Sequence, residues 1–358
     1  MCSSDLPGMG EVFAGRYELL DPVATGGMGT IWRVLDRTDG QLKAAKILRQ
    51  SDAASLLRFV REQSVRIDHT HVVTPLSWAG VDDRVLFTMP LVHGGSVADL
   101  LQEHGALPPR WVAILTDQLL QALEAVHAAG IVHRDVKPGN LLLEPTGTRT
   151  PHLRLTDFGI AAPLDQPRMT HGAHAIGTPG YMPPEQWHGG DPDPRSDLYA
   201  VGRVVLEMLL GRRLTDDDQP ATVGIGGSSD TTAGRLVELV THATQADPAD
   251  RPATATQMRA AIADLVSLPP VPDEPVVTVP DRFPAATVPD LPPPPPPRHG
   301  LAPTVAPTAV PAAGQTIAFQ PGGQTSSAAA ARPSAVPGLV LLLVGLVGLA
   351  VATWLLLG

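Results

Sequence analysis

Half of the prolines in this chain lie in one stretch, which limits where a folded domain can be. Of the 38 prolines, 19 fall between Pro269 and Pro337, six of them consecutive at 292–297. Proline fixes φ and has no backbone N–H, so it is excluded from the interior of helices and sheets. A chain this rich in Pro, Ala, Val and Thr favours extended polyproline II. The sequence therefore predicts a tail over residues 1–16, a folded domain over 17–268 and a disordered linker over 269–337.

An apolar run follows the predicted linker. Leu339–Leu357 holds no charged residue in 19 positions, which is about 28 Å of helix and close to the ~30 Å hydrocarbon core of a bilayer. We expect a transmembrane helix over 338–357, in contact with the lipid bilayer. Arg298 and Arg332 precede it, so we expect a single-pass cell-membrane protein with its folded domain in the cytoplasm. With only Gly358 after the span, no outer sensor domain is expected.

Charge and cysteine content exclude two further features. The formal net charge of −10 argues against nucleic acid as a partner, because phosphate binding needs a basic face. The one cysteine, Cys2, cannot form an intramolecular disulfide. The single cysteine agrees with a protein whose folded domain lies in a reducing compartment.

Hydrophobic periodicity divides the predicted domain into two parts. From Tyr17 to about Leu91 short apolar segments alternate with turn signals, which is typical of strands, and one helical stretch, Ala53–Ile67, interrupts them. From Ser96 onward the apolar spacing is helical. Helices are expected over Trp111–Ala129, Ser196–Leu210, Ala233–Gln245 and Thr254–Val266. The fold class is therefore α+β, with a small sheet-rich lobe before a larger helical lobe.

A glycine-rich segment joins two of the strand-like stretches, and it reads Ala24, Thr25, Gly26, Gly27, Met28, Gly29. Glycines let a hairpin backbone approach phosphates with its N–H groups, although a merely flexible hairpin uses the same residues. Lys46 follows in an apolar strand, where a lysine is usually a snorkelling surface residue. Here Glu62, on the next predicted helix, is available for an ion pair that would hold Lys46 against phosphate oxygens.

The strongest chemical signal is a pair of segments, His133–Asn140 (HRDVKPGN) and Asp157–Gly159 (DFG). With the glycine-rich segment and Lys46 in the same order, they resemble the protein kinase family, and most closely its bacterial transmembrane Ser/Thr kinases. The resemblance covers about residues 17–268. It implies the two-lobed kinase fold, in which a small antiparallel sheet lobe carries one key helix and a larger lobe is helical.

The resemblance also implies roles in the transfer of the γ-phosphate of ATP to a hydroxyl. Asp135 would accept the proton of the substrate hydroxyl, and Lys137 would approach the transferring phosphate. Asn140 and Asp157 would hold Mg²⁺, or Mn²⁺ in its place. Lys46, fixed by its ion pair, would hold the α- and β-phosphates. These groups act as a set, because such catalysis consists of positioning and charge neutralisation.

Recognition of the nucleotide base is expected from the backbone after Met89, the gatekeeper position. The carbonyl of Pro90 would accept a hydrogen bond from the adenine amine, and the N–H of Val92 would donate one to the ring. Ala44 and Leu142 would sandwich the purine, although each also suits an ordinary core position. The glycine-rich segment would cover the phosphates.

A further segment, Gly177–Glu185, resembles the part of a protein kinase that receives a peptide. Arg251 would pair with Glu185 and brace the segment, while Asp197 would anchor the catalytic loop. A small-molecule phosphotransferase would lack this segment and its brace, so protein substrates are expected. Lys137 marks specificity for Ser/Thr over tyrosine in the family.

Two departures from the family pattern leave an alternative open. Ala24 replaces the usual first glycine, which would be strained if that position needs φ > 0, and Pro183 replaces a small residue. Neither change removes a catalytic group, so an active kinase stays the main expectation. The alternative function is a pseudokinase or scaffold that recruits partners through the linker.

The linker is either a spacer or a set of autophosphorylated threonines to which phosphothreonine-binding modules bind. Thr170 is expected to be an activating autophosphorylation site. A transient homodimer is also expected, in which one kinase molecule activates its neighbour in trans.

Overall fold

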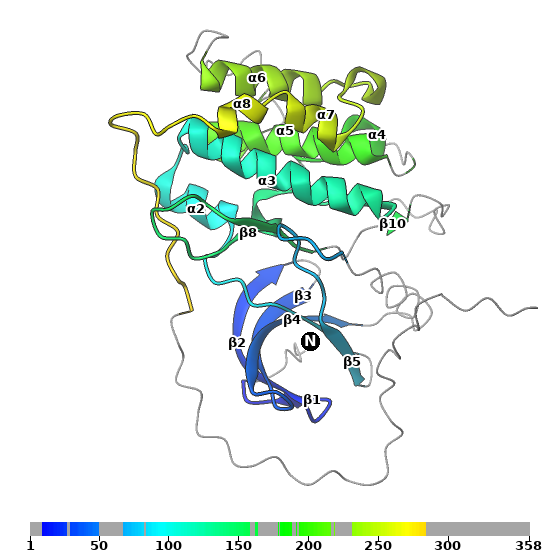
Figure 1. Ribbon diagram of the computed structural model, residues 1–358. Helices are drawn as coiled ribbons and strands as arrows, with labels where there is room; N and C mark the ends of the chain where they lie inside the picture. The colour runs from blue at the N-terminus through cyan, green and yellow to red at the C-terminus, as the bar shows by residue number, and fades with distance from the viewer. Residues whose placement is uncertain are drawn as a thin grey trace, which may run out of the picture. The chain divides into compact units, whose positions relative to one another are not determined.

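The computed structural model describes residues 9–26, 29–49, 67–81, 84–157, 162–163, 178, 180–187, 191, 193–215, 218 and 231–283. All of them lie in the first of two units, Met1–Pro294, and the second unit covers Pro295–Gly358. Figure 1 shows a sheet lobe and a helical lobe within the first unit. The predicted α+β class, with a small sheet-rich lobe followed by a helical lobe, is therefore confirmed.

Among the described residues the small lobe is an antiparallel sheet in the order β1-β2-β3-β4-β6-β5 (Figure 1). Alternate residues of β3, including Trp32 and Val34, face its core, as the period of two in a strand requires. They pack with Phe13, Tyr17 and Leu19. The strands are β1 (Val12–Phe13), β2 (Tyr17–Gly26), β3 (Gly29–Asp36), β4 (Gln41–Arg49), β5 (Ser77–Val81) and β6 (Arg84–Met89).

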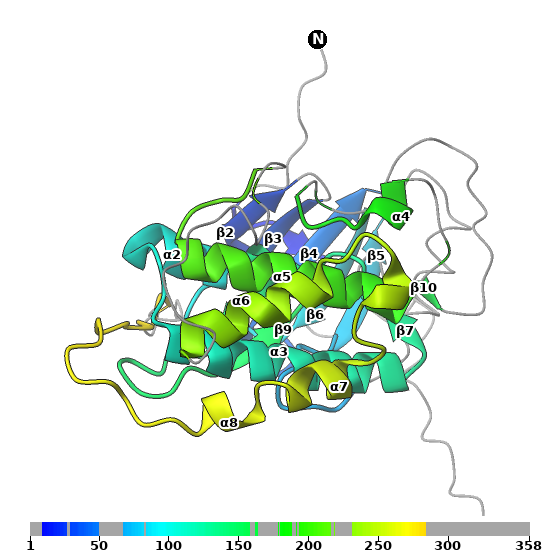
Figure 2. The same ribbon diagram turned by 90° about the horizontal axis from the view of Figure 1, so that it is seen from above.

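The large lobe is built around α3, which packs against α5, α6, α7 and α8 (Figure 2). One stripe of α3, at spacings of three and four residues, is fully buried and consists of Val112, Leu115, Leu119, Leu123 and Val126. The helices are α2 (Val97–His104), α3 (Pro109–Ala128), α4 (Pro184–Trp187), α5 (Pro194–Leu210), α6 (Thr232–Ala243), α7 (Ala255–Ala260) and α8 (Ala263–Val266).

Two short ladders lie where the helical lobe meets the sheet lobe. They pair β7 (Ile131–Val132) with β10 (Ala162–Pro163), and β8 (Leu141–Leu143) with β9 (Leu153–Leu155). The segment between β7 and β8 ends in a 3₁₀ turn at Pro138–Asn140. The backbone of this segment is therefore held at both ends by ladders.

Three of the predicted helices lie close to their expected bounds, and the fourth is divided. α3, α5 and α6 match the predictions to within two residues at each end. The helix expected over Thr254–Val266 is instead α7 and α8, and the carbonyl of Ala261 between them accepts a hydrogen bond from Arg235 (3.0 Å). That tertiary contact has no signal in the local periodicity. Residues 53–66 of the helix expected over Ala53–Ile67 lie outside the described residues.

The structure corrects the predicted start of the disordered linker. Residues 269–283 are described, and Val277 and Val279 within them are buried against the large lobe. Hydrogen bonds from this segment to other parts of the domain hold it in place despite its prolines. The rest of the linker and the expected span over 338–357 lie outside the described residues. Within the described part of the chain, none of the helices combines the length and apolar character that crossing a bilayer requires.

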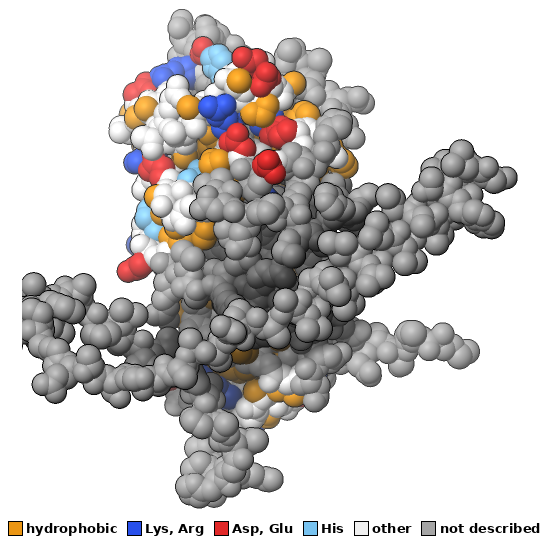
Figure 3. Space-filling model, turned by 90° about the vertical axis from the view of Figure 1, so that its right-hand side faces the viewer, with side chains coloured by type: hydrophobic (Ala, Val, Ile, Leu, Met, Phe, Trp, Pro, Cys, Tyr) orange, Lys and Arg blue, Asp and Glu red, His pale blue; other side chains and the backbone are white. Residues whose placement is uncertain are grey.

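The side of the large lobe drawn in Figure 3 carries acidic, basic and hydrophobic side chains close to one another. Two ion pairs of the large lobe are Arg235–Asp264 and Arg212–Asp218. Opposite charges therefore neighbour each other on this lobe, as on an ordinary solvated surface.

Candidate active site

The loop between β7 and β8 surrounds Asp135, whose side chain is 4% exposed. Its Oδ2 accepts from Lys137 Nζ (2.7 Å) and from Asn140 Nδ2 (3.0 Å), and its Oδ1 accepts from Thr178 Oγ1 (2.8 Å). Lys137 Nζ also donates to Thr178 Oγ1 (2.8 Å). The carboxylate is thus held from both sides, and a hydroxyl already lies at hydrogen-bond distance from it.

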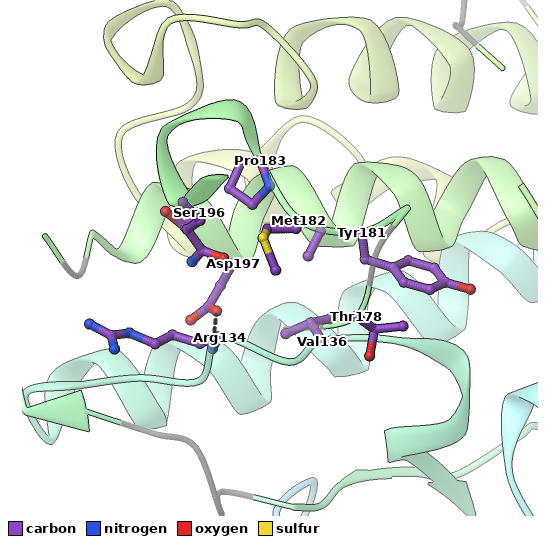
Figure 4. A pocket seen from close by; sticks show the side chains of 10 residues that line it. Arg134, Val136, Thr178, Tyr181, Met182, Pro183, Ser196 and Asp197 are labelled. Atoms are coloured by element: carbon purple, nitrogen blue, oxygen red, sulfur yellow. Dashed lines mark hydrogen bonds between the residues drawn. The ribbon is translucent and has the colours of Figure 1, made fainter. Parts of the chain in front are cut away.

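Asp197 on α5 holds this loop through hydrogen bonds to its backbone (Figure 4). Its carboxylate accepts from the backbone N–H groups of His133 (2.9 Å) and Arg134 (2.8 Å) and from His127 Nε2 (2.8 Å). Burial alone would raise the pKa of Asp197, but the hydrogen bond from His127 and the other donors lower it below the ordinary value. These bonds hold Arg134 at φ 67°, a conformation that costs a non-glycine residue about 1 kcal/mol or more.

Lys46 on β4 forms an ion pair with Asp157, which follows β9. Lys46 is nearly buried, and Asp157 adopts φ 70°. The expected partner Glu62 lies outside the described residues, so the Lys46–Glu62 pair stays a prediction. The structure instead brings the expected phosphate-binding lysine to the expected metal ligand, across the two lobes.

The residues present fit a magnesium site. Asn140 donates from Nδ2 to the backbone oxygen of Asp135 (2.7 Å) and to its side chain, so its amide oxygen is the atom that remains for a cation. Asp157 adds a carboxylate, and both are hard oxygen ligands that Mg²⁺ prefers. Within the described part of the chain no group of three or more His, Cys, Asp or Glu side chains could hold a metal by itself. A pair of protein ligands completed by phosphate oxygens agrees with this arrangement.

The expected base-binding residues lie on neighbouring backbones. Ala44 on β4 is opposite Met89 on β6 in the sheet register, and both Ala44 and Val92 are buried. Pro90 follows β6 directly, while Leu142 is the middle residue of β8 in the other lobe. The structure therefore has one expected purine contact in each lobe.

The described part of the glycine-rich segment forms the turn end of the β2–β3 hairpin. Ala24, Thr25 and Gly26 pair with residues of β3, while Gly27 and Met28 lie outside the described residues. Ala24 does not adopt a positive φ, so alanine causes no left-handed strain there. Gly29 does require glycine, because it has φ 138° and a Cβ would lie 2.5 Å from the carbonyl oxygen of Ile47.

The segment expected to receive a peptide is braced as predicted. Arg251, with a fully buried side chain, donates two hydrogen bonds to Glu185 (2.7 and 2.8 Å), and Ser196 adds a third (2.9 Å). Burial alone would raise the pKa of Glu185, but the bonds from Arg251 and Ser196 lower it below the ordinary value. Residues 184–187 are thereby fixed to α5 and to the turn before α7.

Comparison with known proteins decides the family. Residues 17–260 match the family described as protein kinase domain. The chain belongs to the protein kinase family. This kinase is 35% identical over 229 residues to the serine/threonine-protein kinase PknA of Mycobacterium tuberculosis, covering 61% of this chain and 52% of the relative.

Other bacterial serine/threonine-protein kinases are also similar to this kinase. The serine/threonine-protein kinase PkaA of Streptomyces coelicolor is 37% identical over 213 residues, covering 55% of this chain and 39% of the relative. The serine/threonine-protein kinase pkn3 of Myxococcus xanthus is 31% identical over 276 residues, covering 70% and 50%. The kinase therefore spans about half the length, or less, of these curated relatives.

Sequence reasoning missed two contributors to the kinase site. Thr178 was seen only as part of a peptide-binding segment, yet its hydroxyl bonds both Asp135 and Lys137. His127 was seen only as part of α3, yet it supports Asp197. Thr178 lies 43 residues from Asp135 and His127 lies 70 from Asp197, so no local spacing connects them.

Proposed function

We propose that this kinase transfers the γ-phosphate of ATP to Ser and Thr hydroxyls of proteins, itself included. The observation that carries the proposal is the hydroxyl of Thr178, which donates to Asp135 Oδ1 and accepts from Lys137 Nζ, both at 2.8 Å. A substrate hydroxyl must make the same two contacts for the reaction.

In the proposed reaction the substrate hydroxyl oxygen bonds to the γ-phosphorus while the bond from that phosphorus to the oxygen of ADP breaks. The proton of the hydroxyl passes to Asp135. Lys137 stays beside the transferring group, where its charge offsets the developing negative charge. Lys46 is placed to bind phosphate oxygens after exchanging its contact with Asp157. Magnesium, held by Asn140 and Asp157, would neutralise phosphate charge when bound.

A protein substrate is favoured over a small molecule by the braced segment before α5. Three hydrogen bonds among Glu185, Arg251 and Ser196 hold this segment. Breaking such a buried ion pair costs about 3–5 kcal/mol. The segment is therefore strongly held, although transfer to a small molecule would not need it. The bacterial relatives named serine/threonine-protein kinases support the same substrate class.

The test is phosphosite mapping after incubation of the purified full chain with ATP and magnesium. We expect Ser/Thr phosphorylation in the wild type, including Thr170, and a loss of several orders of magnitude in Asp135→Asn, Asp157→Asn and Lys46→Met. Near-wild-type transfer by Asp157→Asn, with contaminating kinases excluded, would refute the mechanism. Nucleotide binding without transfer in the wild type would favour the pseudokinase or scaffold.

We also propose that residues 338–357 anchor the kinase in the cell membrane with the domain in the cytoplasm, where ATP is available. The uncharged run of 19 residues supports this. Confinement to a surface would raise the local concentration and favour activation in trans between neighbours. Threonines of the linker would then be substrates within reach, and phosphothreonine-binding modules would be their partners.

A further inference from the structure

The chain does not leave the domain after α8 but returns along its side (Figure 1, yellow). We call residues 276–283 the tail strap. Val277 and Val279 are 3% and 0% exposed, whereas Val276 is 73% exposed, so the strap shows strand-like alternation. Val279 exchanges two backbone hydrogen bonds with Gly147, both 2.9 Å. The strap is thus bound through its backbone as well as through its apolar side chains.

The strap contacts the connection between the two lobes, residues 90–95. Arg282 donates from its backbone N–H to the carbonyl of His93 (2.8 Å) and from Nε to the carbonyl of Gly94 (3.3 Å). Its guanidinium also pairs with Glu103 on α2 (2.5 Å). A Cβ at Gly94 would lie 2.6 Å from Val279, so the close approach of the strap depends on that glycine.

The last strap residue described reaches the small lobe. The ring of Phe283 lies 5.7 Å from the guanidinium carbon of Arg33 on β3, a cation–π distance. It also meets the ring of His93 edge-on at 5.8 Å. One short segment therefore touches the small lobe, the connection and α2.

The residues that the strap contacts are neighbours of Ala44 and Leu142, the two residues expected to sandwich the purine. Arg33 is directly opposite Ala44 in the β3–β4 register. In the large lobe, Leu143 beside Leu142 exchanges backbone hydrogen bonds with the glycine pair 94–95, both 2.8 Å, and that pair is what Arg282 and Val279 hold. The strap therefore contacts the neighbours of Ala44 in the small lobe and of Leu142 in the large lobe.

We propose that the tail strap is a positioning segment for ATP, in which Arg282 and Phe283 hold the connection 90–95 at the spacing that the purine needs. The inference rests on the proposed function for its kinetic consequence, but nucleotide binding tests it independently. A strap that only stabilised the fold would change the unfolding midpoint without changing nucleotide affinity.

The experiment uses the full chain with Arg282→Ala, Arg282→Lys, Phe283→Leu and the control Val276→Ala, whose side chain faces solvent. Affinity for a fluorescent ATP analogue is measured directly, and KM for ATP and kcat are measured by phosphate transfer. We expect Arg282→Ala and Phe283→Leu to raise Kd and KM about fivefold, since each removes interactions of modest strength. Arg282→Lys should lie between, because lysine keeps the charge opposite Glu103, and Val276→Ala should match the wild type.

Two outcomes would overturn the proposal. One is an unchanged Kd in both Arg282→Ala and Phe283→Leu, whatever happens to the melting temperature. The other is a fall in kcat with Kd and KM unchanged, which would make the strap a general support. If Kd rises as expected while no protein of the set transfers phosphate, the strap proposal stands and the proposed function fails.

Discussion

At the scale of single residues, Thr178 offers the sharpest test of the site. Its hydroxyl joins Asp135 to Lys137, so Thr178→Val should lower kcat roughly 10²-fold by removing one polar group that positions both. Thr178→Ser keeps the hydroxyl and should retain most of the activity. Initial rates of phosphate transfer at saturating ATP measure the difference. Equal rates for the two variants, at equal melting temperatures, would show that the hydroxyl has no part in the reaction.

Asp197 supports the same loop from a fully buried position. Replacing it with Asn turns one acceptor oxygen into a donor, which would face the N–H of His133 at the Oδ2 position or the N–H of Arg134 at the Oδ1 position. We expect Asp197→Asn to lose about 3 kcal/mol of unfolding free energy, measured by urea denaturation. Asp264→Asn is the matched control, because Asp264 pairs with Arg235 at the exposed surface, and it should have far less effect. A loss of the same size in both variants would contradict the anchoring role.

At the scale of elements, the brace between α4 and the turn before α7 predicts an acid-sensitive contribution to stability. The pKa of Glu185 is lower in the fold than its ordinary 4.5. Its stabilisation is therefore complete above about pH 4.5 and is lost as the pH falls through the lower folded value. Glu185→Gln should lose about 3 kcal/mol at neutral pH, because Arg251 stays buried without its partner charge.

Urea unfolding between pH 3 and pH 7 measures this dependence. The difference between wild type and Glu185→Gln should shrink as the pH falls below 4.5. Glu238→Gln, on the exposed side of α6, should follow the wild-type curve throughout. A constant difference at every pH would mean that the carboxylate charge of Glu185 contributes nothing.

Elements were predictable from the sequence where local pattern decides them. The buried stripe of α3 repeats at helical spacing, and its prediction was accurate. The division between α7 and α8 was missed because Arg235, on another helix, takes the carbonyl of Ala261. The order of motifs likewise indicated Asp135, Lys137 and Asn140, which are close in the chain. Thr178, His127 and the contact of Lys46 with Asp157 depend on the tertiary fold, which single-sequence patterns do not report.

At the scale of the whole molecule, anchorage in a membrane is the prediction to test. Full-length protein should sediment with membranes, whereas a chain ending at Pro337 should remain in the soluble fraction, because it lacks the apolar run. Protease added to intact cells should leave the kinase domain uncut. Equal solubility of the two proteins, or loss of the domain to external protease, would contradict the proposed topology.

The tail strap also bears on how this protein should be produced in the laboratory. The family match ends at residue 260, yet Ile262, Leu265, Val277 and Val279 beyond it are buried. A protein that ends at residue 260 or at residue 268 would expose to solvent the apolar surface that Val277 and Val279 cover. An exposed apolar patch of this kind promotes self-association. A protein that extends through Phe283 should therefore give a higher soluble yield than either shorter version. The end of the sequence match is thus not the end of the folded domain.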